Sequence, residues 1–375
     1  MFYLAIDQHS KQLTVNLRNE DGDVVLRRQV STSPESVKTF FKSLAEQCAD
    51  DSGYAAILEV CGFNDWLLAL LREPWTQCQE IVLIQPEKRS RQKTDRRDAN
   101  NLGETLWVNR HRLLTGKPVQ NVRRILLGDS EESADRQLTA LRKRTVARRT
   151  RVINKAWRIV QKHNLQHERP TKGIQTKKAR RWLGELDLPE IDRLELDQLL
   201  AEWNLLEKHL ETVDARIADR YRKNPKAQLV STIPGVAKYG GLAIGSRISQ
   251  INRFPRGASL SNFFGLAPGC RNSGNDTDRN GAITKRGSGM VRFLLGQVVL
   301  HVLRDDPWMR QWYRQVKRRR GSNVARVAVM RRLATILWSM LKHNMPYVRG
   351  GPEEFRKALK AKQALSSGTL NDGGV

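Results

Sequence analysis

Apolar residues in the first third of the chain switch between the spacing of strands and the spacing of helices. Short apolar or alternating runs predict strands at residues 2–6, 12–18, 23–30, 54–60 and 80–84. Helical spacing follows the last three of these strands, and helices are expected to begin near Ser33, Trp66 and Thr94. Three successive strands followed by strand–helix alternation predict an α/β domain with a mixed sheet flanked by helices.

Two long charged segments, residues 131–164 and 189–222, carry apolar residues at helical spacing. They predict an antiparallel coiled-coil arm or a dimerising pair, split by the polar stretch HERPTKGIQT at 167–176. From residue 228 the pattern predicts an apolar helix, a Pro-Gly hairpin and further helices around 290–304 and 323–342.

These patterns divide the chain into four parts. An α/β domain is expected over residues 1–125, a helical coiled-coil linker for dimerisation and nucleic-acid binding over 126–225, and a mainly α domain over 226–350. Residues 351–375, which end in LSSGTLNDGGV, are expected to be a disordered tail.

Charge is distributed unevenly along these parts. The chain has 66 Lys and Arg against 39 Asp and Glu, a net charge of +27. Residues 1–85 carry 7 basic and 12 acidic side chains, whereas residues 86–125 carry 11 and 4, and the rest of the chain is strongly basic. A basic body of this kind predicts nucleic-acid binding, because Lys and Arg replace the counterions condensed along phosphates.

The remaining composition excludes other classes of protein. The four cysteines form no C-x-x-C pair and no His cluster accompanies them, which argues against a zinc site or a disulfide framework. No apolar run approaches the roughly 18 residues of a membrane span, and the N-terminal residues do not have the pattern of a signal peptide. A reduced, cytoplasmic protein is therefore expected.

Four acidic residues fall where the predicted sheet would bring them together. Asp7 and Glu59 end two apolar strands, and Asp95 and Asp98 begin the helix that follows the last strand. Residues three apart share a helix face, so a D-E-D-x-x-D cluster is expected at one edge of the sheet. Such a cluster suits Mg²⁺, with two ions about 4 Å apart and Mn²⁺ able to substitute, although strand-end and helix-start acids often serve only as caps.

Basic residues accompany three candidate sites and predict contacts with phosphate, although each group is also compatible with a solvated face. Near the carboxylates they are Lys93, Arg96 and Arg97. On the first long helix they are Arg142, Lys143, Arg144, Arg148, Arg149 and Arg151. Around Ser273, in the Gly- and Asn-rich stretch GLAPGCRNSG, they are Arg271, Arg279, Lys285 and Arg286. On composition alone the stretch favours an ordinary turn serine at Ser273 over a nucleophile.

Several stretches resemble the transposases of the insertion sequence 110 family, the bridge-RNA-guided DEDD recombinases. The resemblance covers nearly the whole chain and is carried by AIDQHSKQLTV (5–15), LEVCG (58–62), KTDRRDA (93–99), IPGV (233–236), RFPRGASLSNFFGLAPGCRNSG (253–274) and ITKRG (283–287). Cys61 departs from the family, which more often has Thr or Ser before the glycine.

The resemblance implies a RuvC-like, ribonuclease-H-like fold for the first domain and a serine transposase domain over residues 226–350. It implies that Asp7, Glu59, Asp95 and Asp98 bind metal and that Ser273 attacks DNA to form a phosphoserine link. It further implies donor and target DNA as substrates, a guide RNA, a homodimer or tetramer with composite active sites, and a prokaryotic, nucleoid-associated location.

Two alternatives remain open at this stage. One is a RuvC-type, metal-only nuclease that resolves DNA junctions, for which Ser273 would be dispensable. The other is a nucleic-acid-binding protein without catalytic activity, for which Asp98→Asn would change nothing.

Overall fold

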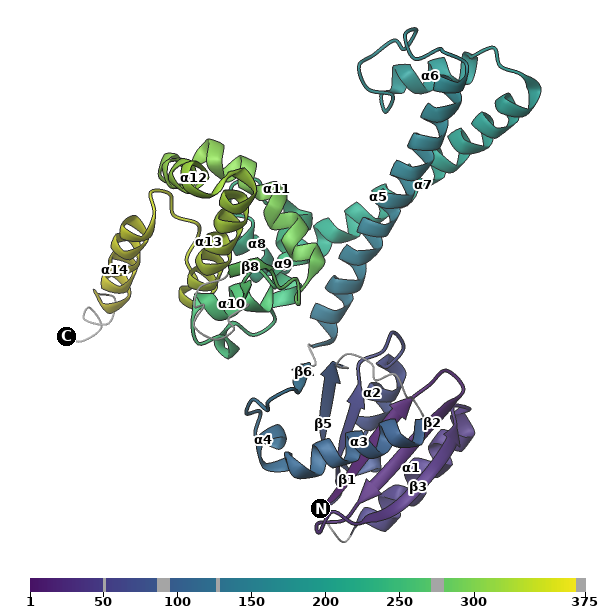
Figure 1. Ribbon diagram of the computed structural model, residues 1–375, viewed down its shortest axis with the longest axis vertical. Coiled ribbons are helices and arrows are strands. Elements are labelled where there is room, and N and C mark those ends of the chain that lie inside the picture. Colours follow the sequence, from purple (N-terminus) through teal and green to yellow (C-terminus); the bar gives the residue numbers. More distant parts are fainter. Residues whose placement is uncertain (50–51, 86–94, 126–128, 271–279, 369–375) are drawn as a thin grey trace, which may run out of the picture. The chain divides into compact units, whose positions relative to one another are not determined.

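The computed structural model describes residues 1–49, 52–85, 95–125, 129–270 and 280–368. The chain forms two compact units, Met1–Leu127 and Gly128–Val375 (Figure 1). The first unit contains a mixed sheet with helices, and the second is mainly helical, so the predicted fold class is confirmed. No helix in these ranges is long and apolar enough to cross a membrane.

Six strands of the described chain form the sheet of the first unit, in the order β3-β2-β1-β4-β5-β6. Their bounds are Phe2–Gln8 (β1), Gln12–Arg18 (β2), Val24–Ser31 (β3), Tyr54–Glu59 (β4), Cys78–Gln85 (β5) and Arg123–Ile125 (β6). The first three strands are an antiparallel meander, and β1, β4 and β5 run parallel to one another. The five predicted strands are therefore confirmed, and β6 adds an antiparallel edge that sequence analysis did not identify.

Each face of this sheet is covered by helices, because alternate side chains of the strands point to opposite sides. The helices α1 (Pro34–Cys48) and α2 (Asp65–Leu71) pack on the face that carries Leu4, Ile6 and Leu58. The helices α3 (Asp95–Val108) and α4 (Arg110–Leu114) pack on the face that carries Ala5 and Ile57. A short turn of 3₁₀ helix, Pro74–Thr76, precedes β5.

The direction of α3 across the sheet is set by its contacts with β2 and with the turn that follows β2. A side chain on Gly103 would lie 2.8 Å from Asn16 Oδ1, so only a glycine allows the helix to approach β2 so closely here. Near the far end of α3, the Trp107 ring packs on Gly22 and its Nε1 donates to the Glu20 carbonyl at 3.0 Å. Glu20 and Gly22 lie beside the start of β1, so the first turn of α3 lies toward the end of β1.

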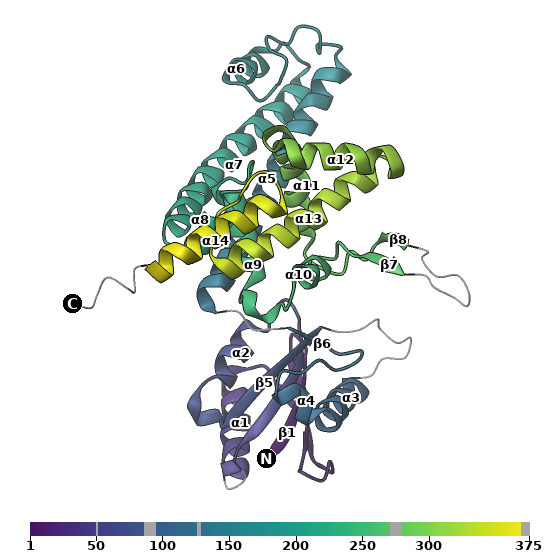
Figure 2. The same ribbon diagram turned by 90° about the vertical axis from the view of Figure 1, so that its left-hand side faces the viewer.

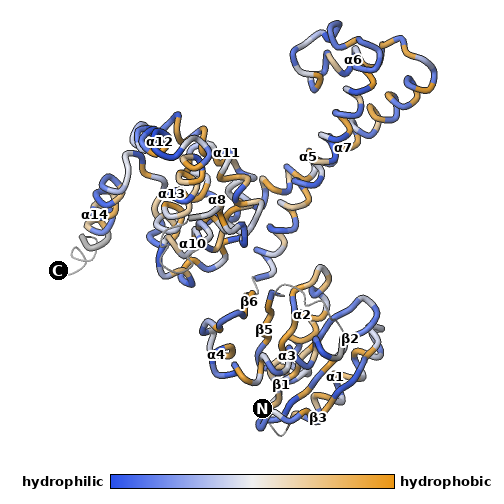
Figure 3. The backbone as a smooth tube through the Cα atoms, viewed as in Figure 1, coloured by the Kyte–Doolittle hydropathy of each residue, from blue (hydrophilic) through white to orange (hydrophobic). Residues whose placement is uncertain are grey.

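The second unit begins with a long helical hairpin, formed by α5 (Ser130–Lys162) and α7 (Glu190–Arg222), with α6 (Lys177–Glu185) packed on α7 (Figure 2). Its core is a row of apolar side chains from both long helices, in which Trp203 is fully buried. Apolar and polar stretches follow one another along both helices (Figure 3). α5 and α7 pack side by side and run in opposite directions (Figure 1), which confirms the predicted antiparallel arm.

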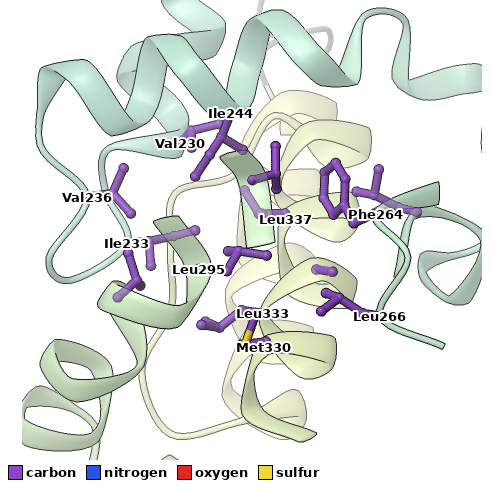
Figure 4. Packing of buried hydrophobic residues seen from close by; sticks show 14 of the residues in the cluster. Val230, Ile233, Val236, Ile244, Phe264, Leu266, Leu295, Met330, Leu333 and Leu337 are labelled. Carbon is purple, nitrogen blue, oxygen red and sulfur yellow. The ribbon is translucent and has the colours of Figure 1, made fainter. Parts of the chain in front are cut away.

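A compact helical bundle follows the hairpin. It comprises α8 (Pro225–Val230), α9 (Lys238–Ile248), the 3₁₀ turn Ile251–Arg253, α10 (Gly257–Phe263), α11 (Gly289–Asp305), α12 (Pro307–Arg320) and α13 (Ser322–His343). Leu295, Leu333 and Phe264 meet in its buried core (Figure 4). A two-stranded hairpin, β7 (Pro268–Cys270) and β8 (Asn280–Ile283), interrupts the helices and frames residues 271–279, which lie outside the described residues.

The prediction of a disordered tail from residue 351 onward is wrong for most of that segment. Residues Pro352–Gly368 form α14, which starts after two glycines at φ +90° and has Glu353 and Glu354 in its first turn. Lys362 Nζ donates to the carbonyls of His343 and Asn344 at 3.2 and 2.9 Å, so the helix is held at the end of α13. The polar composition of this segment predicts disorder. Contacts with the bundle stabilise the helix, and such tertiary contacts are not visible in the composition.

Candidate active site and nucleic-acid interface

Asp7 and Glu59 are placed side by side by the pairing of the two strands that carry them. β1 and β4 are parallel and in register through Ile6 and Leu58, so the next residues of both strands are neighbours. Asp7 and Glu59 both follow the alternation of Ala5 and Ile57, so they belong to the face of the sheet that α3 covers. Adjacent strands lie about 4.8 Å apart, which brings the two carboxylates within reach of one ligand.

The start of α3 lies toward the same end of the sheet. Asp98 is partly buried in its first turn, and the next residue, Ala99, is buried. The backbone of Asp95 begins the helix, while its side chain and that of Arg96 lie outside the described residues, as does Lys93. The topology therefore places Asp7 beside Glu59 and the start of α3 toward the same end of the sheet, while the joining of the four acids into one site stays a prediction.

Asp7 has a titratable neighbour that sequence analysis did not single out. His9 Nε2 lies 3.0 Å from Asp7 Oδ2, and the Asp7 side chain is 16% exposed. A histidine two residues beyond the carboxylate can hold it in one orientation and can exchange a proton with it. The sequence D-Q-H at the end of β1 could have indicated this contact, because residues two apart along an extended strand share one face.

The loop after Glu59 is fixed by a buried amide network that sequence analysis also missed. Asn64 is 3% exposed, and its Nδ2 donates to Gln8 Oε1 at 2.8 Å and to the Glu59 carbonyl at 3.2 Å. Gln8 Nε2 in turn donates to the Phe63 carbonyl at 3.0 Å. Cys61, the departure from the family pattern, lies 3.8 Å from Gln8 through its sulfur and so joins this network rather than the carboxylates. These bonds tie the ends of β1 and β4 together behind the two acids.

The donor set suits a hard divalent cation, because carboxylate oxygens are the ligands that Mg²⁺ prefers. Within the described side chains, no group of three or more Asp, Glu, His or Cys is placed to hold a metal ion. Asp7 and Glu59 lie on adjacent strands, and Asp98 lies in the first turn of α3. Their carboxylates are of the chemical type that a divalent metal prefers, and a metal site formed by all four acids stays a prediction.

The predicted phosphate track on α5 divides into two groups. Arg142 is half-buried and forms a two-point ion pair with Asp214 of α7, through Nε at 2.5 Å and Nη2 at 3.1 Å. Its guanidinium stacks on Tyr239, and the hydrogen bond to Asp214 raises the pKa of Arg142. Arg149 pairs with Glu207 at 3.3 Å. For these two arginines a surface phosphate contact is the wrong interpretation, because their charge is used inside the hairpin.

The other basic residues of the track are exposed. Arg144 and Arg151 are exposed, and Arg148 is exposed with Glu202 3.6 Å away. Lys143 is exposed too, and its Nζ lies 5.9 Å from the centre of the Phe293 ring. Two further exposed residues, Lys155 and Arg158, continue the face that carries Arg144, Arg148 and Arg151. Their spacing of 4, 3, 4 and 3 residues keeps all five on one side of the helix. We call this set the α5 basic row.

The residues around the candidate nucleophile are only partly described. Ser273, Arg271 and Arg279 lie outside the described residues, between β7 and β8. Lys285 and Arg286 are exposed in the turn that follows β8. Lys285 has φ +54° and its backbone N–H donates to the Gly265 carbonyl at 3.1 Å, so the TKRG turn is packed against the end of α10. Ser288 is not a free hydroxyl, because it caps α11 by accepting from the Val291 N–H.

Comparison with known proteins decides the family. Residues 4–164 match the model of the DEDD transposases of the IS110 group, and residues 227–314 match the model described as "Transposase IS116/IS110/IS902 family". The chain belongs to the IS110/IS116/IS902 family of transposases. Members of this family are DNA strand-transfer enzymes, and the DEDD domain implies divalent metal ions.

Individual relatives agree with this placement. A protein of Coxiella burnetii named "Transposase for insertion sequence element IS1111A" is 28% identical over 307 residues, 78% of each chain. A "Probable family 20 transposase" of Pseudomonas aeruginosa is 24% identical over 362 residues, which cover 92% of this chain and 98% of its own. The match therefore spans both compact units, and the transposase binds DNA.

The two groups of arginines on α5 should respond differently to substitution. Arg142→Ala is expected to lower the free energy of unfolding by about 1–2 kcal/mol, because it leaves Asp214 without its two-point partner. Arg144→Ala should change it by less than about 0.5 kcal/mol, because the side chain is exposed. Urea denaturation followed by circular dichroism would measure both, and equal effects would contradict the division.

Proposed function

We propose that this IS110-family transposase cuts and rejoins DNA through a covalent link to Ser273, with divalent metal held by Asp7, Glu59, Asp95 and Asp98. The observation that carries the proposal is the register of β1 and β4, which sets Asp7 beside Glu59 at the edge where α3 begins. When bound there, Mg²⁺ or Mn²⁺, with two ions accommodated, would neutralise phosphate charge and lower the pKa of bound water.

The protein groups at this edge have distinct tasks in the proposal. The four carboxylates hold the metal and align the reacting phosphate. Gln8 and Asn64 keep the ends of β1 and β4 rigid, so that the carboxylates keep their spacing. His9 is 43% exposed and 3.0 Å from Asp7, so it can pass a proton between this edge and solvent.

The covalent step is a transesterification at phosphorus. The Ser273 hydroxyl oxygen forms a bond to phosphorus while the bond from phosphorus to the leaving sugar oxygen breaks. The serine proton is released and the leaving oxygen is protonated. One phosphoester bond replaces another, so the energy of the broken bond is retained in the phosphoserine link and no oxidant or reductant is needed. Arg271, Lys285 and Arg286 supply positive charge for the phosphate, and Arg279 adds to it.

Nucleic acid is proposed to lie along the α5 basic row as well as at the two reacting sites. Between residues 137 and 162 the sequence of α5 contains no Asp or Glu, so the helix itself adds no negative charge to this face, and Glu202 of α7 lies beside Arg148 alone of the row. A row of about 21 Å, from Arg144 to Arg158 at 1.5 Å per residue, matches the length of a short duplex segment. The proposed occupants are the donor and target DNA and the guide RNA of the element, which would select both sites by base pairing.

The transposase is further proposed to act as a dimer or tetramer, in which the carboxylates of one subunit meet Ser273 of another. Large apolar side chains are exposed on one side of α7, where Ile191, Leu194 and Leu205 are 71%, 55% and 51% exposed. Their spacings of 3 and 11 residues place them on one face of the helix. An exposed apolar row on a helix supports pairing with a second copy.

Ser273→Ala is expected to abolish the covalent protein–DNA adduct, because the attacking hydroxyl is removed. The measurement is a denaturing gel of full-length protein incubated with Mg²⁺, plasmid bearing the element and RNA transcribed from its non-coding end. Ser322→Ala, an exposed serine at the start of α13, is the matched control and should keep the adduct. An adduct that persists in Ser273→Ala would sink the serine role, and metal-dependent nicks without any adduct would favour the RuvC-type nuclease.

Leu194→Glu should shift the protein toward monomers, since a charge in the exposed row of α7 opposes apolar pairing. Size-exclusion chromatography with light scattering would report the mass of each variant. Ala215→Glu adds the same charge at an exposed position of α7 outside the row and should leave the mass unchanged. Identical masses for both variants and the wild type would remove α7 from the interface.

A further inference from the structure

A groove of about 590 Å³ lies beside the carboxylates, between α3 and the strands β2 and β3. Its rim carries three arginines, Arg27, Arg28 and Arg97, and its lining includes several amide and hydroxyl side chains. Among the described residues that line it, none is acidic. A concave, positive and amide-rich surface of this kind is suited to an anion rather than to an apolar ligand.

The lining of the groove includes a buried hydroxyl that the described residues leave unsatisfied. Thr14 is 4% exposed, and its Oγ1 has no hydrogen-bond partner among the described residues. Buried polar atoms normally find partners, so an unsatisfied hydroxyl in the lining of a groove points to a ligand. Thr14 can donate its hydroxyl proton to such a ligand.

The side-chain amide of Asn100, which also lines the groove, is oriented by hydrogen bonds to its oxygen. Asn100 Oδ1 accepts from Arg18 Nη2 at 3.2 Å and lies 3.5 Å from Asn16 Nδ2. Arg18 is itself fixed, since it pairs with Glu104 at 2.9 Å and donates to the Gly22 carbonyl at 2.7 Å. With its oxygen occupied, Asn100 has its NH₂ group left to offer to the groove.

The groove has a defined register relative to the carboxylates. Asp7 pairs with Thr14, and Thr14 pairs with Gln29, so Glu59, Asp7, Thr14 and Gln29 form one row across four strands. Asn16 and Arg27 pair in the next row of the same face. At about 4.8 Å per strand, Thr14 lies about 5 Å from Asp7, and the strand of Arg27 and Gln29 lies about 10 Å from it.

We infer that this groove binds a backbone phosphate of the nucleic-acid strand whose neighbouring phosphate reacts at the carboxylates. The groove lies about 10 Å from the carboxylates across the strands, so the phosphate that it binds is close along the strand to the reacting one. Arg27 and Arg97 neutralise the phosphate, and Thr14 and Asn100 donate to its oxygens. The inference rests on the proposed role of Asp7 and Glu59, and it makes the groove a positioning site that takes no part in the chemistry.

The first test measures binding without metal, so that it does not depend on the carboxylates. The full-length protein with Arg27→Ala and Arg97→Ala is titrated in EDTA against fluorescent single-stranded DNA, duplex DNA and RNA over a range of salt. Affinity is expected to fall about 10-fold, and the slope of log K against log salt should decrease by about 1 to 2. Lys38→Ala, an exposed cation on α1 on the other face of the sheet, is the control. A loss of DNA affinity supports the inference, and a loss confined to RNA would overturn it, because the guide RNA is not the strand that reacts.

The second test locates the phosphate. In a series of DNA substrates, each carries one neutral methylphosphonate in place of a backbone phosphate near the cleavage site. Cleavage of each substrate is compared for the wild-type protein, Arg27→Ala/Arg97→Ala and Thr14→Val. The wild type should be most sensitive at one phosphate close to that site, and both variants should lose this sensitivity. Equal position profiles in all three proteins, or a binding loss no larger than that of Lys38→Ala, would overturn the inference. If no cleavage occurs the proposed chemistry fails, while the metal-free affinities still decide the groove.

Discussion

The parallel pairing of β1 with β4 is the constraint on which the rest of the site depends. It is the one contact in the sheet that joins the antiparallel meander to the βαβ part, and it ends with Asp7 beside Glu59. The residues before them alternate between the cores on the two faces of the sheet, so a slip of one residue in either strand would turn the carboxylate of that strand toward the face that α1 and α2 cover. The hydrophobic cores on the two faces of the sheet therefore determine which way Asp7 and Glu59 point.

The helix α3 adds the second half of the site through packing rather than through charge. Gly103 allows the close approach to β2, and Trp107 fixes the far end of the helix on the turn at Gly22. Its first turn, with Asp95 and Asp98, is thereby held at the end of the sheet where β1 finishes. The same packing buries Thr14 and Asn16 and creates the groove beside the carboxylates.

The strands, the long helices and the positions of Asp7 and Glu59 at the ends of neighbouring strands could be predicted from the sequence, because their patterns are local and strong. The alternation Leu13, Val15, Leu17 identified one face of β2, but nothing local showed that Thr14 and Asn16 on its other face would be buried as well. Likewise, a run of arginines on α5 cannot reveal which of them pair, because Asp214, the partner of Arg142, is 72 residues away. The order of α14 depends on contacts with α13 in the same way. In each case the prediction failed because the feature depends on a contact between residues far apart in the sequence.

The central claim is that Asp7 and Glu59 are ligands of one divalent metal. Electron paramagnetic resonance of Mn²⁺ titrated into the nucleic-acid-free protein tests it most directly, since it reads binding without any DNA chemistry. The account predicts that Asp7→Asn and Glu59→Gln each weaken Mn²⁺ binding at least about 10-fold, a change of about 1.4 kcal/mol. Glu46→Gln, an exposed position on α1, should bind like the wild type. Wild-type affinity in both Asp7→Asn and Glu59→Gln would contradict the account.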